Sequence, residues 1–305
     1  MLKVGVVGLG KMGRIHLRNY TEMDGVEVVG VVDVVAEARK QVEEQFGVPA
    51  FATVKELLAQ KPDAVSICVP TSLHHEAGME LIDGKVNVII EKPLAATSAQ
   101  GAELVKLAAD KDVKLMVGHV ERFNPAIVRL KELLGDDVIS IQIKRVSPYP
   151  ARIQDVGVIK DLGSHDIDLL RFLSGSDIKS VYAVCSATMG EHEDSALINA
   201  EMENGVLANI TTNWVTPYRE RSIIATCKSK QFVVNLMAQE ICEYSAAPDD
   251  NAYTVREWPV MARETIKEEL TQFLGAVRNN TEVPITGEDG LQVLQVFDRI
   301  FECVK

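Results

Sequence analysis

One stretch near the start of the sequence has the spacing of a phosphate-binding turn. It is Gly8-Leu9-Gly10-Lys11-Met12-Gly13, a GxGxxG motif that directly follows the apolar run Lys3–Val7. In such a motif the first glycine permits a tight turn, the second lets the backbone approach a pyrophosphate, and the third lets a helix pack closely on a strand. The following helix offers free amides at its N-terminus. The motif therefore predicts a dinucleotide site; the alternative is an ordinary glycine turn.

Asp33 indicates which dinucleotide binds. It ends the run Val26–Asp33 and follows Gly13 by 20 residues, where a carboxylate can accept hydrogen bonds from the adenine-ribose hydroxyls. The same carboxylate repels a 2′-phosphate, and Val34 and Val35 offer no compensating donor, so NAD is favoured over NADP. Arg39 could reach a 2′-phosphate, or it could lie on the solvated face of a helix.

Lys92, Asp161 and His165 could together move a proton. Lys92 lies in Glu91-Lys92-Pro93, directly after the apolar run Val86–Ile90, and Asp161 and His165 are four residues apart, which puts them on one face of a helix. Hydride removal from a carbinol carbon requires the hydroxyl proton to leave, and a neutral imidazole with a pKa of about 6.5 suits that task. Lys92 could hold the hydroxyl oxygen of the substrate or take part in the transfer of its proton. In the structural alternative, Asp161 caps a helix and His165 only packs.

The elements that carry these residues change in kind along the chain. Residues 1–121 alternate short apolar runs with amphipathic segments, the pattern of an α/β domain with a doubly wound parallel sheet, called a Rossmann domain. Thr53 with Glu56 and Thr97 with Gln100 form capping-box patterns at two helix starts. The predicted strands are Lys3–Val7, Val26–Asp33, Ala64–Val69, Asn87–Ile90 and Lys114–Val117.

Residues 122–305 have a different pattern of apolar and polar residues. A helix opened by Asn124 as N-cap and Pro125 is followed by runs that alternate with period two, which is typical of a sheet with one covered and one more polar face. We therefore predict a second, α+β domain with a large, mainly antiparallel, open-faced sheet and two closing helices, about 262–279 and 288–304. The predicted strands are Ile139–Lys144, Ile198–Met202, Val206–Thr212, Ser222–Thr226 and Gln231–Asn235.

Length and composition limit the class of protein. The chain has 305 residues, 47% of them hydrophobic and 25% charged, which excludes a disordered chain, a collagen-like repeat and a disulfide-rich miniprotein. A net charge of −12 argues against nucleic-acid or anionic-membrane partners. The five scattered cysteines form no CxxC pair and no histidine has zinc spacing, so we expect no metal site. Without an export signal or an apolar run of about 20 residues, we expect a cytoplasmic protein.

The sequence resembles the glucose-fructose oxidoreductase and inositol dehydrogenase family in motifs spread along nearly the whole chain: Gly8–Gly13, Asp33, Pro70-Thr71 with His74, Glu91–Pro93, Arg122–Pro125, Asp161 with His165, and Pro284–Asp289. The resemblance implies an NAD-dependent dehydrogenase whose substrate lies between the Rossmann domain and the open face of the second sheet. It makes Lys92 and His165 the acid–base pair, which can titrate as a coupled unit, with Asp161 a substrate-binding or orienting group. It places Pro70, Thr71, His74 and Glu91 beside the cofactor and Arg122 and Asn124 beside the substrate. It also implies pairing through the sheets into a homodimer or homotetramer.

Within that family, three segments are similar to enzymes that oxidise the C3 hydroxyl of UDP-N-acetylglucosamine, whose ketone product an aminotransferase can use: Gly118–Pro125, Asp155–Asp168 and Asn213–Pro217. A UDP group needs cations for its pyrophosphate and flat or hydrogen-bonding groups for uracil. Arg145, Arg152, Arg219 and Arg221, with Tyr149 and Tyr218 nearby in sequence, could supply both, or could be ordinary surface residues. We expect Arg152 and Arg219 to bind the pyrophosphate.

Two other functions remain open at this stage. A dehydrogenase of a free polyol or sugar would need no phosphate-binding arginines. A noncatalytic NAD-binding regulator could keep the scaffold without needing Lys92, Asp161 and His165 together. Outside these motifs, His16 and His192 are expected to be solvent-exposed or on a helix surface.

Overall fold

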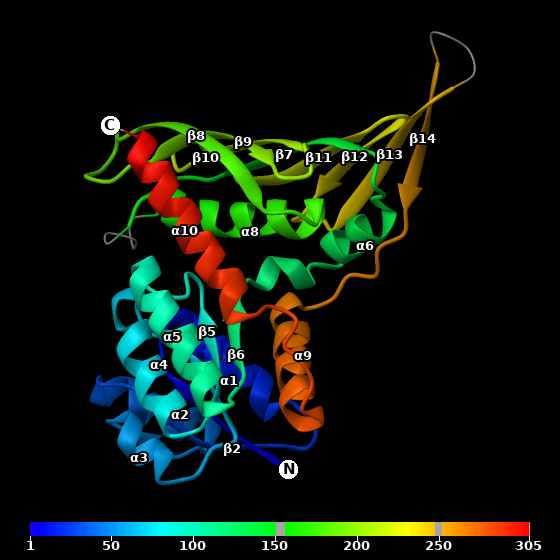
Figure 1. Cartoon of the computed structure of the whole chain (residues 1–305). Helices are drawn as coiled ribbons and strands as arrows, with labels where there is room; N and C mark the ends of the chain where they lie inside the picture. The colour runs from blue at the N-terminus through cyan, green and yellow to red at the C-terminus, as the bar shows by residue number, and fades with distance from the viewer. Residues whose placement is uncertain (151–155, 248–251, 305) are drawn as a thin grey trace. The chain divides into compact units, whose positions relative to one another are not determined.

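The computed structural model of the protein describes residues 1–150, 156–247 and 252–304 (Figure 1). By their internal contacts they form two compact units. Unit 1 comprises Met1–Val120 and Glu264–Leu294, and unit 2 comprises Glu121–Arg263 and Gln295–Lys305. Residues 264–294 thus pack with the part of the chain that carries the glycine motif. In the described segments, no helix combines the length and the apolar character needed to cross a membrane.

Unit 1 is built on a parallel sheet, which confirms the doubly wound prediction. In its described residues the sheet has six strands in the order β3-β2-β1-β4-β5-β6, an order typical of dinucleotide-binding folds. The strands are β1 Leu2–Val7, β2 Val26–Val32, β3 Ala50–Phe51, β4 Ala64–Ile67, β5 Asn87–Glu91 and β6 Leu115–Gly118. The helices that begin in this unit are α1 Lys11–Thr21, α2 Ala36–Phe46, α3 Val54–Leu58, α4 His74–Asp83, α5 Ser98–Lys111, α9 Thr265–Asn279 and α10 Gly287–Cys303, with the short 3-10 helices Thr71–Leu73 and Val120–Phe123, the latter ending in unit 2.

Polar side chains begin several helices where the sequence predicts. Thr53 accepts from the Glu56 amide while the Glu56 carboxylate accepts from the Thr53 amide, a complete capping box. Thr97 also accepts from the Gln100 amide, but the Gln100 side-chain oxygen has no partner among the described residues, so that box is only half formed.

Unit 2 is built on a mixed, mostly antiparallel sheet. In its described residues the order is β14-β13-β12-β11-β7-β10-β9-β8, and only β7 and β10 pair in parallel. Figure 1 shows α6 and α8 along one side of this sheet, where α6 contacts β12 and β13 and α8 contacts β7 and β10. The elements are α6 Pro125–Leu133, β7 Val138–Val146, α7 Val158–Asp161, α8 Gly163–Ser174, β8 Ile178–Ser186, β9 Ser195–Met202, β10 Leu207–Asn213, β11 Glu220–Cys227, β12 Lys230–Asn235, β13 Glu240–Ala246 and β14 Tyr253–Trp258.

The two faces of this sheet differ as the period-two pattern predicts. Side chains under the helices are buried and apolar, among them Ile143, Ile198 and Ile210. The alternate positions form an open face that is polar but also carries exposed apolar side chains, including Tyr182 and Leu197. The open-faced sheet of the prediction is confirmed.

Candidate active site

The glycine motif forms a tight connection between β1 and α1. Gly8 has a φ of +93°, and a Cβ there would lie 2.7 Å from the carbonyl group of Cys68. A Cβ on Gly13 would lie 1.8 Å from the Gly8 carbonyl oxygen. A Cβ on Gly10 would meet no atom within 4 Å. Packing therefore requires glycine at the first and third positions, whereas the second leaves open space that a ligand can enter.

The N-terminus of α1 has the character of an anion site. Gly10 is the N-cap residue, no side chain caps the helix, and no acidic residue lies in the first turn. The helix dipole and the amides after Gly10 are thus left for another acceptor. Together with the open space at Gly10, these features fit the pyrophosphate of a dinucleotide.

Asp33 lies beside this turn. Its Oδ2 accepts a hydrogen bond from the Leu9 amide at 2.7 Å, and its Oδ1 accepts one from the Val35 amide at 2.8 Å. Each carboxylate oxygen keeps a further lone pair, so Asp33 can hold the glycine turn and still accept from ribose hydroxyls. Arg39 donates to the backbone carbonyls of Asp33 and Val34, at 2.7 and 3.1 Å, and so stabilises the turn between β2 and α2.

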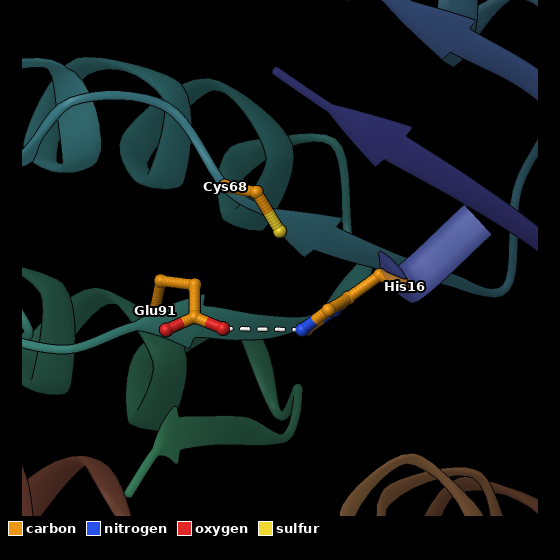
Figure 2. Close-up of side chains that lie close together, drawn as sticks. All are labelled: His16, Cys68 and Glu91. Carbon is orange, nitrogen blue, oxygen red and sulfur yellow. Dashed lines mark hydrogen bonds and ion pairs between the residues drawn. The ribbon is translucent and has the colours of Figure 1, made fainter. Parts of the chain in front are cut away.

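A network of hydrogen-bonded side chains in unit 1 ends at Glu91, the last residue of β5. His16 is 0% exposed, so the expectation of a surface position was wrong. Its Nε2 lies 3.1 Å from Glu91 Oε1 (Figure 2), and its Nδ1 lies 3.0 Å from Ser66 Oγ. Burial disfavours ionisation of Glu91, but the hydrogen bond and charge of His16, with Lys92 and His74, lower the pKa of Glu91 overall. A carboxylate is therefore held at this strand end.

His16, Glu91 and Cys68 also form the one group in the described chain whose nitrogen, oxygen and sulfur atoms could share a metal ion, since all lie within 4.8 Å of one another. Figure 2 shows the Cys68 thiol beside the other two side chains. Burial raises the pKa of this thiol, and His16 and Glu91 bond each other. Hydrogen bonding accounts for this contact without an ion.

Lys92 follows this network and is itself half-buried. The next residue, Pro93, is held by His74, whose Nδ1 lies 2.8 Å from the Pro93 carbonyl oxygen and whose Nε2 lies 2.9 Å from that of Val69. Burial lowers the pKa of His74, so the ring is neutral and can donate to only one of the two carbonyls at a time. Of the other predicted cofactor-side residues, Pro70 is exposed and Thr71 half-buried at the start of the 3-10 helix after Val69.

In unit 2, Asp161 ends α7 and His165 lies in the first turn of α8. Leu162 between the two helices has right-handed helical dihedrals (φ −84°, ψ −44°), so the predicted spacing of one helical turn is kept. Asp161 is the N-cap of neither helix, and His165 is half-buried. The structure therefore contradicts the capping role of Asp161 in the structural alternative. Both helices contact the sheet, α7 at β9 and β10 and α8 at β7 and β10.

The predicted substrate residues Arg122 and Asn124 have strong internal partners. Arg122 forms a two-point ion pair with Asp168, at 2.9 and 2.6 Å, and packs over the Phe172 ring. Asn124 accepts from the Ala126 amide as the predicted N-cap and donates to the Leu236 carbonyl at 3.0 Å. Both side chains connect elements of unit 2.

A second buried network joins α8 to the sheet and was not predicted. Arg145, 1% exposed, donates to Asp166 at 2.7 Å and to Glu121 at 2.8 Å, and Arg221 reaches the same Glu121 oxygen at 3.0 Å. Burial opposes ionisation of Glu121, but Arg145 and Arg221 hold its pKa below the ordinary value. Burial raises the pKa of Asp166. Arg145 is thus a buried structural cation and not a candidate for a substrate phosphate.

Arg219 has a different setting. It is exposed, has no ion pair among the described residues, and lines a cavity of about 690 Å³ within unit 2. The lining also includes Arg221, Ser222, Asn235 and Met237. Arg152, predicted to act with Arg219, lies outside the described residues.

Comparisons with known proteins agree with this geometry. Residues 2–119 match the model of an oxidoreductase family with an NAD-binding Rossmann fold, and residues 137–233 match the GFO/IDH/MocA C-terminal domain. The chain is 29% identical to the UDP-N-acetylglucosamine 3-dehydrogenase of Acidithiobacillus ferrooxidans, over 96% of this chain and 94% of that protein. It is 25% identical to the myo-inositol 2-dehydrogenase of Thermotoga maritima, over 96% and 93% of the two chains.

A solved structure shows the same fold along the whole chain. The UDP-N-acetylglucosamine 3-dehydrogenase GnnA from Acidithiobacillus ferrooxidans superposes with a TM-score of 0.94 at 27% identity, covering 99% of this chain and 97% of that chain.

Proposed function

The chain belongs to the GFO/IDH/MocA family of oxidoreductases, and on this premise we propose that it oxidises the C3 hydroxyl of UDP-N-acetylglucosamine to a ketone. The enzyme is an NAD-dependent dehydrogenase. The observation that carries the choice of substrate is the similarity to a UDP-N-acetylglucosamine 3-dehydrogenase over nearly the full length of both chains, in sequence and in structure. The ketone product is a substrate for an aminotransferase reaction.

In this proposal the protein binds the cofactor with unit 1 and handles the proton with three side chains. Bound NAD supplies the hydride acceptor. The α1 amides and Asp33 hold its pyrophosphate and ribose. Lys92 and His165 are the proposed groups that hold the hydroxyl oxygen and take its proton, and Asp161 is the proposed group that orients the sugar.

The arginine-lined cavity of unit 2 is the proposed site for the diphosphate. Arg219 is exposed and without an ion pair in the described chain, so its guanidinium can bind a phosphate. Arg219→Ala should raise KM for the nucleotide sugar and leave KM for NAD unchanged. The matched control is Lys228→Ala, which removes an exposed cation after β11 that does not line this cavity. An equal rise for both substrates would exclude Arg219 from this role.

The decisive experiment follows absorbance of the reduced nicotinamide when the purified protein meets NAD and UDP-N-acetylglucosamine. A reagent that traps ketones is present because alcohol oxidation can stop at an unfavourable equilibrium. We expect turnover that depends on the trap, is absent with free N-acetylglucosamine, and is lost in Lys92→Ala.

The second candidate is a dehydrogenase of a free polyol, favoured by the similarity to myo-inositol 2-dehydrogenase. Turnover of myo-inositol without turnover of the nucleotide sugar would establish it and overturn the first proposal. UDP alone would then fail to compete with the substrate.

A further inference from the structure

The residues on both sides of Lys92 are each held by a buried histidine of unit 1. His16 on α1 bonds the carboxylate of Glu91, and His74 on α4 bonds the carbonyl group of Pro93. The two rings are 0% and 1% exposed. Such burial is costly for an imidazole unless its polar atoms find partners. Both nitrogens of His16 lie within hydrogen-bond distance of a side chain that can serve as partner, and a neutral His74 donates to one of its two carbonyl neighbours.

The hydrogen bonds around His16 can all run in one direction. The Tyr20 hydroxyl lies 2.7 Å from Ser66 Oγ, which lies 3.0 Å from His16 Nδ1. Burial raises the pKa of Tyr20, so its hydroxyl stays protonated and can donate to Ser66 Oγ. In the tautomer that carries its proton on Nε2, Ser66 can then donate to Nδ1 while Nε2 donates to Glu91. Every member of the chain from Tyr20 to Glu91 is satisfied when Glu91 is an anion.

The partly buried Glu91 and the fully buried Glu269 differ in charge. Glu91 has the His16 hydrogen bond and a lowered pKa, whereas Glu269 on α9 is 0% exposed and neither of its oxygens has a partner among the described residues. Burial, with a smaller effect of Glu91, raises the pKa of Glu269, so it stays neutral. The other titratable groups that act on this network are Tyr20, Cys68, His74 and Lys92.

We propose that His16 is a positioning residue for the reaction: its hydrogen bond holds the Glu91 carboxylate next to Lys92, and His74 fixes the backbone on the other side. His16 lies on α1, the helix whose N-terminus fits the cofactor pyrophosphate. One helix therefore connects the cofactor site to the residue before Lys92. The effect on turnover rests on the dehydrogenase function proposed above, but the effect on Glu91 does not.

Two substitutions of His16 separate positioning from simple packing. His16→Gln can place an amide donor where Nε2 stands, whereas His16→Leu fills similar space without any donor. In His16→Leu the donor is lost and burial becomes the main influence on the pKa of Glu91, so the titration of Glu91 should move up by about 1–2 pH units. In His16→Gln the titration of Glu91 should stay near that of the wild type. The control is His75→Gln, which removes a more exposed histidine whose Nε2 lies 2.7 Å from Glu103.

The first measurement is the carboxyl carbon resonance of Glu91 as a function of pH, assigned by its absence from the spectrum of Glu91→Gln. It needs no substrate. An unchanged Glu91 titration in His16→Leu would overturn the proposal whichever sugar is oxidised. Equal upward shifts in His16→Leu and His16→Gln would also overturn it, because the donor would then be irrelevant.

The second measurement is the pH dependence of kcat. In His16→Leu the acidic limb should move up in step with the Glu91 titration. At a pH below both titrations, kcat should therefore be about 10- to 100-fold lower than in the wild type, and it should recover as the pH rises. NADH binding, followed by calorimetry, confirms that the cofactor site is intact. A Glu91 shift without a shift in the kcat profile would refute the positioning role. Absence of turnover in the wild type would refute the proposed function instead, and the Glu91 titration would still decide for or against the His16 contact.

Discussion

Replacing Gly10 with alanine should weaken NAD binding while leaving unit 1 folded. Gly10 has extended dihedrals that alanine adopts (φ −66°, ψ −168°), and its added Cβ would meet no protein atom within 4 Å. The loss of folding stability should be about 1 kcal/mol or less. The new methyl group occupies the space through which a pyrophosphate approaches the α1 amides.

The size of the binding defect follows from the hydrogen bonds at stake. If the methyl group breaks one bond between a charged phosphate oxygen and an amide, about 1.5–3 kcal/mol is lost. That corresponds to a Kd raised about 10- to 150-fold. Calorimetric titration with NADH measures Kd, and thermal unfolding without ligand measures stability.

The comparison variant is Gly13→Ala, whose Cβ would lie 1.8 Å from the Gly8 carbonyl oxygen. Backbone must shift to relieve this contact, so this variant should lose about 3 kcal/mol or more of folding stability. The expected contrast is a stable Gly10→Ala protein that binds weakly and an unstable Gly13→Ala protein. NADH binding of Gly10→Ala at wild-type strength would refute the placement of the pyrophosphate at this turn.

Four further substitutions test other parts of the structure. Asp33→Ala should bind NAD more weakly and discriminate less against NADP; unchanged selectivity in competitive titrations would contradict the role of this carboxylate. Arg145→Met leaves Glu121 and Asp166 buried without their cation and should cost about 3–5 kcal/mol in denaturant unfolding. Burial alone would raise the pKa of Glu121, but Arg145 and Arg221 lower it by more, so the pKa in the folded protein lies below the ordinary value of 4.5. Ionised Glu121 therefore stabilises the folded state fully above pH 4.5. This stabilisation is lost as the pH falls through the pKa of the folded protein. Glu121→Gln should therefore flatten that acid loss. For the homo-oligomer that we expect to form through the open sheet face, Leu197→Asp should reduce the mass measured by light scattering; a monomeric wild type would remove the basis for this expectation.

Local sequence signals located the glycine turn and several helix starts. The glycine motif, Asp33 and the N-caps Thr53 and Asn124 depend on contacts between residues close in sequence or on strand order, and the structure has them where predicted. The main-sheet strands of unit 1 were found because buried parallel strands are continuous apolar runs. The exception is β3, which has only two residues.

The sequence analysis did not predict the strands that have few buried residues, because they lack a clear apolar pattern. β14 is an edge strand whose residues are almost all exposed, and it shows no period-two pattern. β8 and β13 have few buried positions, so their alternation is weak. The packing of residues 264–294 into unit 1 also has no local signal.

Amino-acid types and short spacings by themselves indicated the fold class and the dinucleotide, because these depend on backbone requirements that recur within a few residues. The family was indicated by a resemblance in motifs spread along nearly the whole chain. Only the tertiary structure decided that His16 is buried against Glu91, that Arg145 is a structural cation, and that Glu269 is a neutral acid. Each of these facts depends on partners 21 to 75 positions apart in the chain or on burial by other elements. The charge of a side chain follows from its desolvation and its partners, and both arise only when the elements pack.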